Sequence, residues 1–328
     1  MRTFIIATLF ILSSSLLSFA QSPTNEPKVL FDEFWTFVDK NYIYFGPKKV
    51  DWNVVYKKYS SQIKEQTTDD ELFAIMDAAV VELKDAHSLL VKPKKVGSQY
   101  DFKNGYDIHF DPNLIKKRYV KDSLGQSGNL YWAILDGNIG YIFLPKFNDF
   151  NAFEQVLRAF KAAKVTKLII DVRNNGGGNS NPVPGLIGTL VQEKTLLGSY
   201  VEKIGPAHND MVKPIPMYAH PRADFHFDIP VVVLINRGCY SATTYFAAMT
   251  KGLPNVTLIG QVTGGGAGGH LGYQLSNGWQ IRVSVSDFLD KGGISTEIGV
   301  SPDVEIINSI DDIKAGRDIM LEKAMQYF

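Results

Sequence analysis

The sequence is poor in cysteine, in net charge and, beyond its first twenty residues, in long apolar runs. A single cysteine among 328 residues excludes an intramolecular disulfide, so a packed core must stabilise the fold. Lysine and arginine together number 34, as do aspartate and glutamate, and this balance argues against nucleic acid as an electrostatic partner. No later apolar run approaches the length of a membrane span, so we expect no integral membrane segment after the N-terminal stretch.

Motifs for bound cofactors are also missing. The chain has no GK[ST] and hence no P-loop, and its histidines and lone cysteine show no metal-ligand spacing. The glycine-rich stretch 264–269 contains the G-x-G-x-x-G spacing of a dinucleotide site, but the residues after it, 272–285, alternate like a β-hairpin instead of forming the required helix. We therefore expect neither a cofactor nor a metal ion.

The first twenty residues, MRTFIIATLFILSSSLLSFA, have the pattern of a secretory signal peptide. A basic start precedes an apolar core, and Ser18, Phe19 and Ala20 form a small-x-small cleavage site before Gln21. This pattern predicts a signal peptide over 1–20 and a secreted or periplasmic protein.

The remaining chain divides by periodicity into three parts. Helical spacing of apolar residues dominates to about residue 90, which predicts a helical subdomain over 21–95. The span 96–134 is basic and aromatic with mixed periodicity, and we expect a β-rich connecting segment there. From residue 135 to the end, strand and helix patterns alternate, which indicates an α/β core.

The segment 228–252, DIPVVVLINRGCYSATTYFAAMTKG, reads as a buried strand, a tight turn and a helix. Ser241 stands at the expected start of that helix, where free backbone N–H groups and the helix dipole can stabilise an oxyanion. Ser241 is therefore either a nucleophile or a simple N-cap. Cys239 could be proposed as a thiol nucleophile, but its position predicts buried packing.

A second strand, in KLIIDVRNNGGG over 167–178, leads directly into three glycines. Gly176, Gly177 and Gly178 carry no Cβ, so the backbone can adopt positive φ and bring its amides close to a reacting oxygen. Such a loop is either a ligand cradle or a flexible turn.

Taken together, these segments resemble the S41 family of serine peptidases, which includes the C-terminal processing proteases, tricorn protease and the interphotoreceptor retinoid-binding repeats. The resemblance implies an α/β core, a crotonase/ClpP-like spiral of strand-strand-helix units, preceded by a helical subdomain. It covers roughly residues 135–310 and rests on four motifs in the family's order: the Asn-Asn-Gly-Gly-Gly loop, Ser241-Ala242, LIGQVTGGG ending at Gly266, and EIGVSPDVEI ending at Ile306.

The family divides on the group that deprotonates the serine. The processing proteases use a lysine whose place is taken here by Gly266, and the span 91–134 is short for their peptide-binding PDZ domain, so we expect neither. The resemblance is instead to the tricorn-like branch, which implies His87, within VELKDAHSLLV, as the base. An ordinary imidazole pKa near 6.5 suits that role.

The same resemblance implies Glu297 as the acid that orients His87, and an oxyanion hole formed by the amides of Ala242 and of Gly176 or Gly177. Tricorn protease carries a serine between acid and base, immediately before its histidine, and this chain has Ala86 there. Glu297 therefore contacts His87 directly, acts through a water, or leaves a weakened site. His270 is expected to line the cleft.

The sequence thus predicts a secreted serine peptidase that acts on peptides or unfolded proteins through Ser241, His87 and Glu297. The alternative is a catalytically weak or inactive S41-like protein that binds peptides or an apolar ligand in the same cleft.

Overall fold

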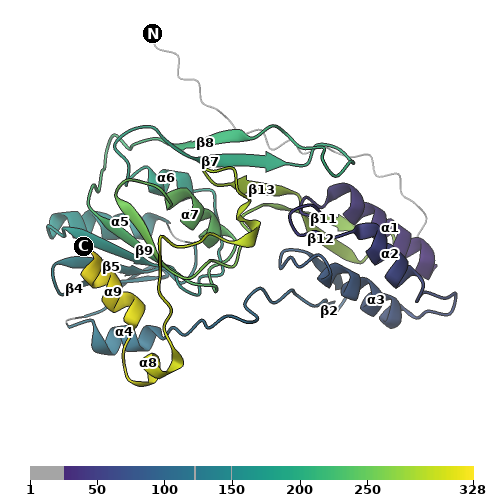
Figure 1. Cartoon of the computed structure of the whole chain (residues 1–328), viewed down its shortest axis with the longest axis horizontal. Coiled ribbons are helices and arrows are strands. Elements are labelled where there is room, and N and C mark those ends of the chain that lie inside the picture. Colours follow the sequence, from purple (N-terminus) through teal and green to yellow (C-terminus); the bar gives the residue numbers. More distant parts are fainter. Residues whose placement is uncertain (1–25, 122, 149) are drawn as a thin grey trace, which may run out of the picture.

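The computed structural model describes residues 26–121, 123–148 and 150–328, so the predicted signal peptide lies outside the described residues. Its helical part and its α/β part occupy opposite ends of an elongated molecule (Figure 1). A long irregular segment runs between them, from the end of β2 (Lys95–Val96) to the start of α4 (Pro112–Arg118).

Three amphipathic helices form the N-terminal end: α1 (Pro27–Asn41), α2 (Trp52–Ser60) and α3 (Asp69–Val81). Their starts follow from local capping, because the Asp51 carboxylate accepts two backbone N–H bonds at α2, and Thr68 with Glu71 forms a capping box at α3. Their apolar faces meet in an aromatic core that includes Phe31, Phe34, Trp52 and Phe73.

The sheet beneath these helices combines two distant parts of the chain. Its strand order is β11-β12-β1-β2, and all neighbours are antiparallel. β1 (Leu89–Lys92) follows the helices, whereas β11 (His270–Gln274) and β12 (Gln280–Ser284) come from the C-terminal half. The hairpin predicted from the alternation of 272–285 is confirmed. Through the pairing of β12 with β1, it completes the sheet of the N-terminal end with residues that are distant in sequence.

The core is built on a seven-stranded sheet in the order β14-β10-β9-β6-β5-β4-β3. Its inner strands are parallel and almost wholly apolar, as expected for strands buried on both faces. The strands are β3 (Gly125–Ser127), β4 (Leu130–Leu135), β5 (Ile139–Phe143), β6 (Lys167–Asp171), β9 (Val231–Ile235), β10 (Val256–Gly260) and β14 (Val304–Glu305).

Helices cover both faces of this sheet, which confirms the expected α/β class. α5 (Phe150–Ala162), α6 (Val183–Ile187) and α7 (Ala242–Thr250) pack on one face. α4 and α9 (Ile319–Tyr327) pack on the other, and α8 (Ile310–Lys314) precedes α9.

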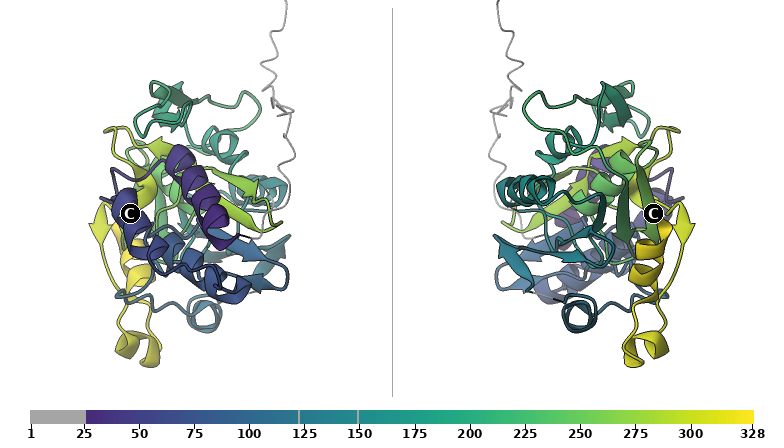
Figure 2. Two further views of the ribbon diagram at one scale, coloured as in Figure 1. Left: turned by 90° about the vertical axis from the view of Figure 1, so that its right-hand side faces the viewer. Right: turned by 90° about the vertical axis from the view of Figure 1, so that its left-hand side faces the viewer.

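A third, smaller sheet, in the order β13-β7-β8, lies outside α7. It comprises β7 (Thr195–Glu202), β8 (Ile215–Ala219) and β13 (Ser286–Leu289), and Phe288 of β13 packs edge-on against Tyr245 of α7. Figure 2 shows β7 and β8 at the end of the molecule opposite to α8.

The expectation of β-structure over 96–134 is correct only in part. β3 and most of β4 lie there, but residues 112–118 form α4. The helix arises because Asp111 accepts a hydrogen bond from the Asn113 N–H and Pro112 occupies the first turn, where its missing N–H costs nothing. No helix within the described ranges is long and apolar enough to cross a membrane.

Candidate active site

Ser241 lies on a sharp turn between β9 and α7. Its backbone has φ 56° and ψ −124°, a strained conformation for a residue with a side chain. The turn is held by backbone bonds, because Ser241 N–H donates to the Gly265 carbonyl at 2.9 Å and Tyr245 N–H donates to the Ser241 carbonyl at 3.0 Å. The Ser241 hydroxyl caps no helix amide, so the simple N-cap interpretation is wrong.

The glycine loop packs directly against this turn. Gly177 has φ +103°, and a Cβ added to it would lie 2.8 Å from Ser241 Cβ and 2.9 Å from Ala242 N. Asn175 ties the two segments together, since its carbonyl accepts from Tyr240 N–H at 3.0 Å and its side chain donates to the Leu144 carbonyl at 2.7 Å. The loop is therefore a fixed neighbour of Ser241 and not a flexible turn.

The amides of this region are not equally free. Gly177 N–H donates to the Asn175 side-chain oxygen at 2.8 Å. The amides of Gly176 and Ala242 have no acceptor within the described part of the chain. Of the two glycines expected from the sequence, Gly176 thus has the available N–H, while Gly177 provides the close approach that only glycine allows.

His87 is positioned by the buried carboxylate of Asp85, a residue for which the sequence predicts no role. Asp85 accepts a hydrogen bond from His87 N–H at 2.8 Å, and its other oxygen accepts from the hydroxyls of Ser88 and Ser284, each at 2.8 Å. Arg282 Nε donates to the His87 carbonyl at 2.7 Å. Since Ser284 and Arg282 belong to β12, the C-terminal half of the chain fixes the histidine of the N-terminal half.

The His87 ring lies against the turn that carries Ser241. Its centroid is 4.9 Å from the ring of Tyr240 and 5.4 Å from that of His270 on β11. Burial lowers the pKa of His87 to about 4, so the imidazole is neutral at neutral pH. No hydrogen bond among the described residues joins it to the Ser241 hydroxyl, and catalytic bonds of this kind are often long without substrate.

Glu297 lies in a short 3-10 helix, η1 (Thr296–Ile298), at the junction of the two ends of the molecule. Its Oε1 is 2.5 Å from Lys48 Nζ, which also donates to the Lys84 carbonyl. Burial, with the nearby Asp85 charge, raises the pKa of Glu297 to about 8 against the opposing effect of Lys48. Lys48 gave no signal in the sequence, because only folding brings the loop after α1 to Glu297.

Cys239 is excluded as the nucleophile. It is fully buried, its thiol donates to the Val172 carbonyl at 3.0 Å, and burial raises its pKa to about 12. The sequence prediction of structural packing is confirmed. No group of three or more His, Cys, Asp or Glu side chains converges as a metal site within the described ranges.

Two hollows adjoin these residues. A cavity of about 210 Å³ at the junction is lined by Lys48, Ala86, Tyr240 and Glu297, among others. A groove of about 400 Å³ crosses the helix-free face of the composite sheet, where Leu89, Arg282 and Gly272 stand side by side on β1, β12 and β11. The groove thus begins beside the strand residues that hold His87.

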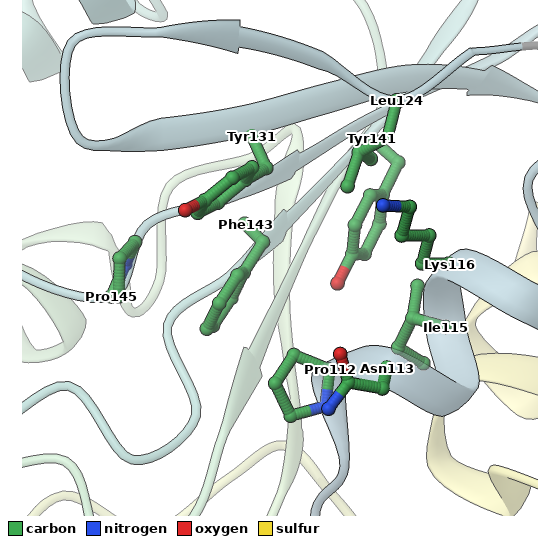
Figure 3. A pocket seen from close by; sticks show the side chains of 9 residues that line it. All are labelled: Pro112, Asn113, Ile115, Lys116, Leu124, Tyr131, Tyr141, Phe143 and Pro145. Atoms are coloured by element: carbon green, nitrogen blue, oxygen red, sulfur yellow. The ribbon is translucent and has the colours of Figure 1, made fainter.

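A larger cavity of about 430 Å³ lies elsewhere, between α4 and the strands β4 and β5 (Figure 3). Tyr131, Tyr141 and Phe143 face it from the sheet, and Ile115 faces it from the helix. None of the candidate catalytic residues lines it. The chemistry, and not the cavity size, therefore identifies the candidate site.

Comparison with known proteins identifies the family. The model of peptidase family S41 matches residues 138–306, and that of the tricorn protease C1 domain matches residues 23–80. Because the first match spans more than half of the chain, the protein belongs to peptidase family S41, and the resemblance predicted from the sequence is confirmed.

Individual relatives agree with this assignment. The chain is 29% identical over 171 residues to the chloroplastic C-terminal processing peptidase of Tetradesmus obliquus, covering 51% of this chain and 35% of that protein. It is 29% identical over 196 residues to the tricorn protease of Thermoplasma volcanium, covering 58% of this chain and 17% of that one. The chain thus spans about a third of the length of the Tetradesmus relative and less of the Thermoplasma one.

The chain superposes on the solved structure of a protein from Parabacteroides merdae that is described as a peptidase by inference, with a TM-score of 0.86 at 32% identity. The match covers 93% of this chain and 97% of that one. The likeness therefore extends over the N-terminal helices as well as the core, and it confirms the expected S41 fold.

Proposed function

We propose that this protein is a serine peptidase in which Ser241 is the nucleophile, His87 the general base and Glu297 the acid that orients it. The main observation in support is the turn at Ser241, where the strained backbone leaves the side-chain hydroxyl free of any helix-capping hydrogen bond. Gly177 and the Ala242 amide lie beside it, and the ring of His87 packs on the preceding residue. Strain of this kind persists where the surrounding structure enforces it, commonly at active sites.

In the proposed reaction, the neutral imidazole of His87 takes the Ser241 hydroxyl proton as the oxygen attacks a peptide carbonyl carbon. The amides of Ala242 and Gly176 stabilise the resulting oxyanion. The protonated His87 then gives its proton to the leaving amine, and the C–N bond breaks. Water, deprotonated by the same histidine, hydrolyses the acyl-enzyme and restores the serine.

The groove over β1, β11 and β12 supports a peptide substrate. β11 is the edge strand of its sheet, and all five of its residues are exposed. An extended peptide could pair with such an edge through backbone hydrogen bonds while its side chains enter the groove. A folded domain presents few free extended segments, so we propose peptides and unfolded chains as substrates. The pattern of residues 1–20 supports export from the cytoplasm.

One observation favours the alternative of a weak or non-catalytic binding protein. Glu297 pairs with Lys48, and Ala86 supplies no hydroxyl between the acid and the base. If this arrangement leaves His87 unsupported, the cleft would bind peptides with little turnover.

A serine-reactive fluorophosphonate distinguishes the two functions. The peptidase proposal expects labelling of the purified protein at Ser241, detected by peptide mapping, together with hydrolysis of an unfolded casein. Ser241→Ala is the matched control and should abolish both signals. A folded wild-type protein that is neither labelled nor hydrolytic, yet retains peptides, would establish the binding alternative.

A further inference from the structure

Gly266 and Tyr240 occupy adjoining space. Gly266 has φ +72°, and a Cβ built on it would lie 2.3 Å from Tyr240 Cζ and 2.6 Å from Tyr240 Oη. The phenol therefore fills the volume that any side chain at residue 266 would enter. Tyr240 directly precedes Ser241, so the turn that positions the serine also positions this phenol.

The ring of Tyr240 is held on two sides. It stacks on Phe102 at a centroid distance of 4.3 Å and an interplanar angle of 16°, and it contacts the His87 ring at 4.9 Å. The segment carrying Phe102 is anchored in turn, because Arg237 Nε donates to the Phe102 carbonyl at 2.7 Å. Tyr240 is thus fixed between the connecting segment and the candidate base.

Three buried polar atoms at this junction have no hydrogen-bond partner among the described residues: His87 Nδ1, Tyr240 Oη and Glu297 Oε2. Buried polar atoms are rarely left unpaired, because the loss of their hydration costs about 1 to 3 kcal/mol each. Tyr240, Glu297 and Ala86 line one cavity. Tyr240 and Glu297 thus border the position where the sequence has an alanine and no relay hydroxyl, and the His87 ring contacts the ring of Tyr240.

We propose that the Tyr240 hydroxyl is the positioning group between Glu297 and His87, accepting a hydrogen bond from His87 Nδ1–H and donating one to Glu297 Oε2. The inference rests on the proposed Ser-His-Glu function and deepens it. A hydroxyl can donate one bond and accept another, so it matches the two unpaired atoms. This arrangement fixes the proton on Nδ1 and leaves Nε2 free to accept the serine proton.

The electrostatics agree with a neutral relay. Burial, with the charges of Asp85 and Glu297, raises the pKa of Tyr240 well above its ordinary value and outweighs the opposing effect of the Ala86 and His87 backbone, so the phenol stays protonated and does not compete as a base. His87 itself faces Asp85 from its own loop, Arg282 and His270 from β12 and β11, and Lys48 from the loop after α1. Asp85 favours the imidazolium and the other three oppose it.

The test compares two tyrosine-to-phenylalanine variants. Tyr240→Phe removes the hydroxyl and keeps the stacked ring, and we expect kcat to fall by on the order of 10² with KM changed by less than about threefold. Tyr245→Phe makes the same chemical change five residues further along the chain, on α7, where the hydroxyl contacts Met217 Sδ, and should retain wild-type kinetics. Fluorophosphonate labelling of wild-type Ser241 verifies the underlying peptidase function independently.

Rescue separates a relay from a structural role. Ala86→Ser in the Tyr240→Phe protein places a hydroxyl next to His87, and kcat should recover at least about fivefold. If that double variant does not fold, the pH profile decides, because Tyr240→Phe should also shift the acid limb of kcat. The proposal is overturned if Tyr240→Phe keeps the wild-type kcat. It is also overturned if the variant changes only in KM or in thermal stability while the pH profile of kcat is unshifted. Labelled Ser241 with an active Tyr240→Phe would reject the relay while retaining the peptidase.

Discussion

The described part of the chain contains two buried ion-pair clusters, and they differ in how completely they are hydrogen-bonded. In the core, Arg173 is fully buried and donates to both oxygens of Asp171 and of Asp318. Tyr141 and Asn308 supply further bonds to these carboxylates. At the junction, Lys48 contacts one oxygen of Glu297, and the other oxygen has no partner in the described chain.

This difference distinguishes a structural cluster from one that we propose to be functional. A saturated network has no capacity left for substrate or proton transfer, and it fastens the start of α9 to the end of β6. A partly satisfied cluster keeps unpaired groups with shifted pKa values, which is how acid–base sites are commonly built. Changes in the core should therefore affect folding, whereas changes at the junction should affect activity and its pH dependence.

The largest expected effect is on turnover. Ser241→Ala and His87→Ala should each abolish most peptide hydrolysis, and the double variant should be little worse than either, because members of one catalytic unit are not additive. Cys239→Ser is the control and should retain activity. Steady-state kinetics on one peptide would check this, and a folded Ser241→Ala with normal turnover would reject the nucleophile.

The second effect tests the saturated cluster. Arg173→Met leaves two buried carboxylates without their cation, so the free energy of unfolding should fall by about 3 to 5 kcal/mol. Lys48→Met is the comparison at the junction and should cost clearly less, because it strands one carboxylate that can become protonated. Urea unfolding measures both. Equal losses would mean that the two clusters do not differ as described.

The third effect concerns the glycine loop. A side chain at Gly177 must meet the Tyr240 carbonyl at 2.7 Å as well as the Ser241 turn, so Gly177→Val should lower kcat by on the order of 10² or more. Gly176→Ala is the matched neighbour, since its Cβ would meet nothing within 4 Å and its amide is retained. Kinetics of both variants, with circular dichroism as the check of folding, would show whether the loop acts in catalysis.

The smallest effect is a shift in pH profile, and its direction follows from two groups. His87, with its pKa lowered to about 4, is already neutral over the neutral range and does not set the limb. Glu297, with its pKa raised to about 8, accepts the relay bond more strongly as a carboxylate and then stabilises the imidazolium, so kcat/KM should rise through about pH 8. Lys48 lowers the pKa of Glu297, so Lys48→Met should move this limb upward.

The control for that profile is Glu297→Gln, which has no proton to lose and should remove the limb near pH 8 along with most of the activity. A wild-type limb near 6.5 that Lys48→Met leaves in place would assign the titration to an ordinary histidine. That result would mean that His87 titrates with the ordinary imidazole pKa near 6.5 that the sequence alone predicts.

The local sequence was sufficient to predict those helices, strands and turns that depend on interactions between residues close together in the chain. The apolar run 230–235 and the helical pattern after Ser241 predicted the strand, turn and helix around this residue, and the alternation of 272–285 predicted a hairpin. α4 was missed because its signal, Asp111 followed by Pro112, stands before a basic stretch with one buried residue, Ile115.

The sequence by itself determined the S41 family, the α/β core and the residue types available for catalysis, because these depend on motifs and periodicity within short segments. Only the tertiary structure decided how those residues meet. It placed β12 beside β1 so that Ser284 and Arg282 position Asp85 and His87, brought Lys48 to Glu297, and set Tyr240 against Gly266. These contacts join side chains from separate elements, and their energies depend on burial, which no local pattern of residues encodes.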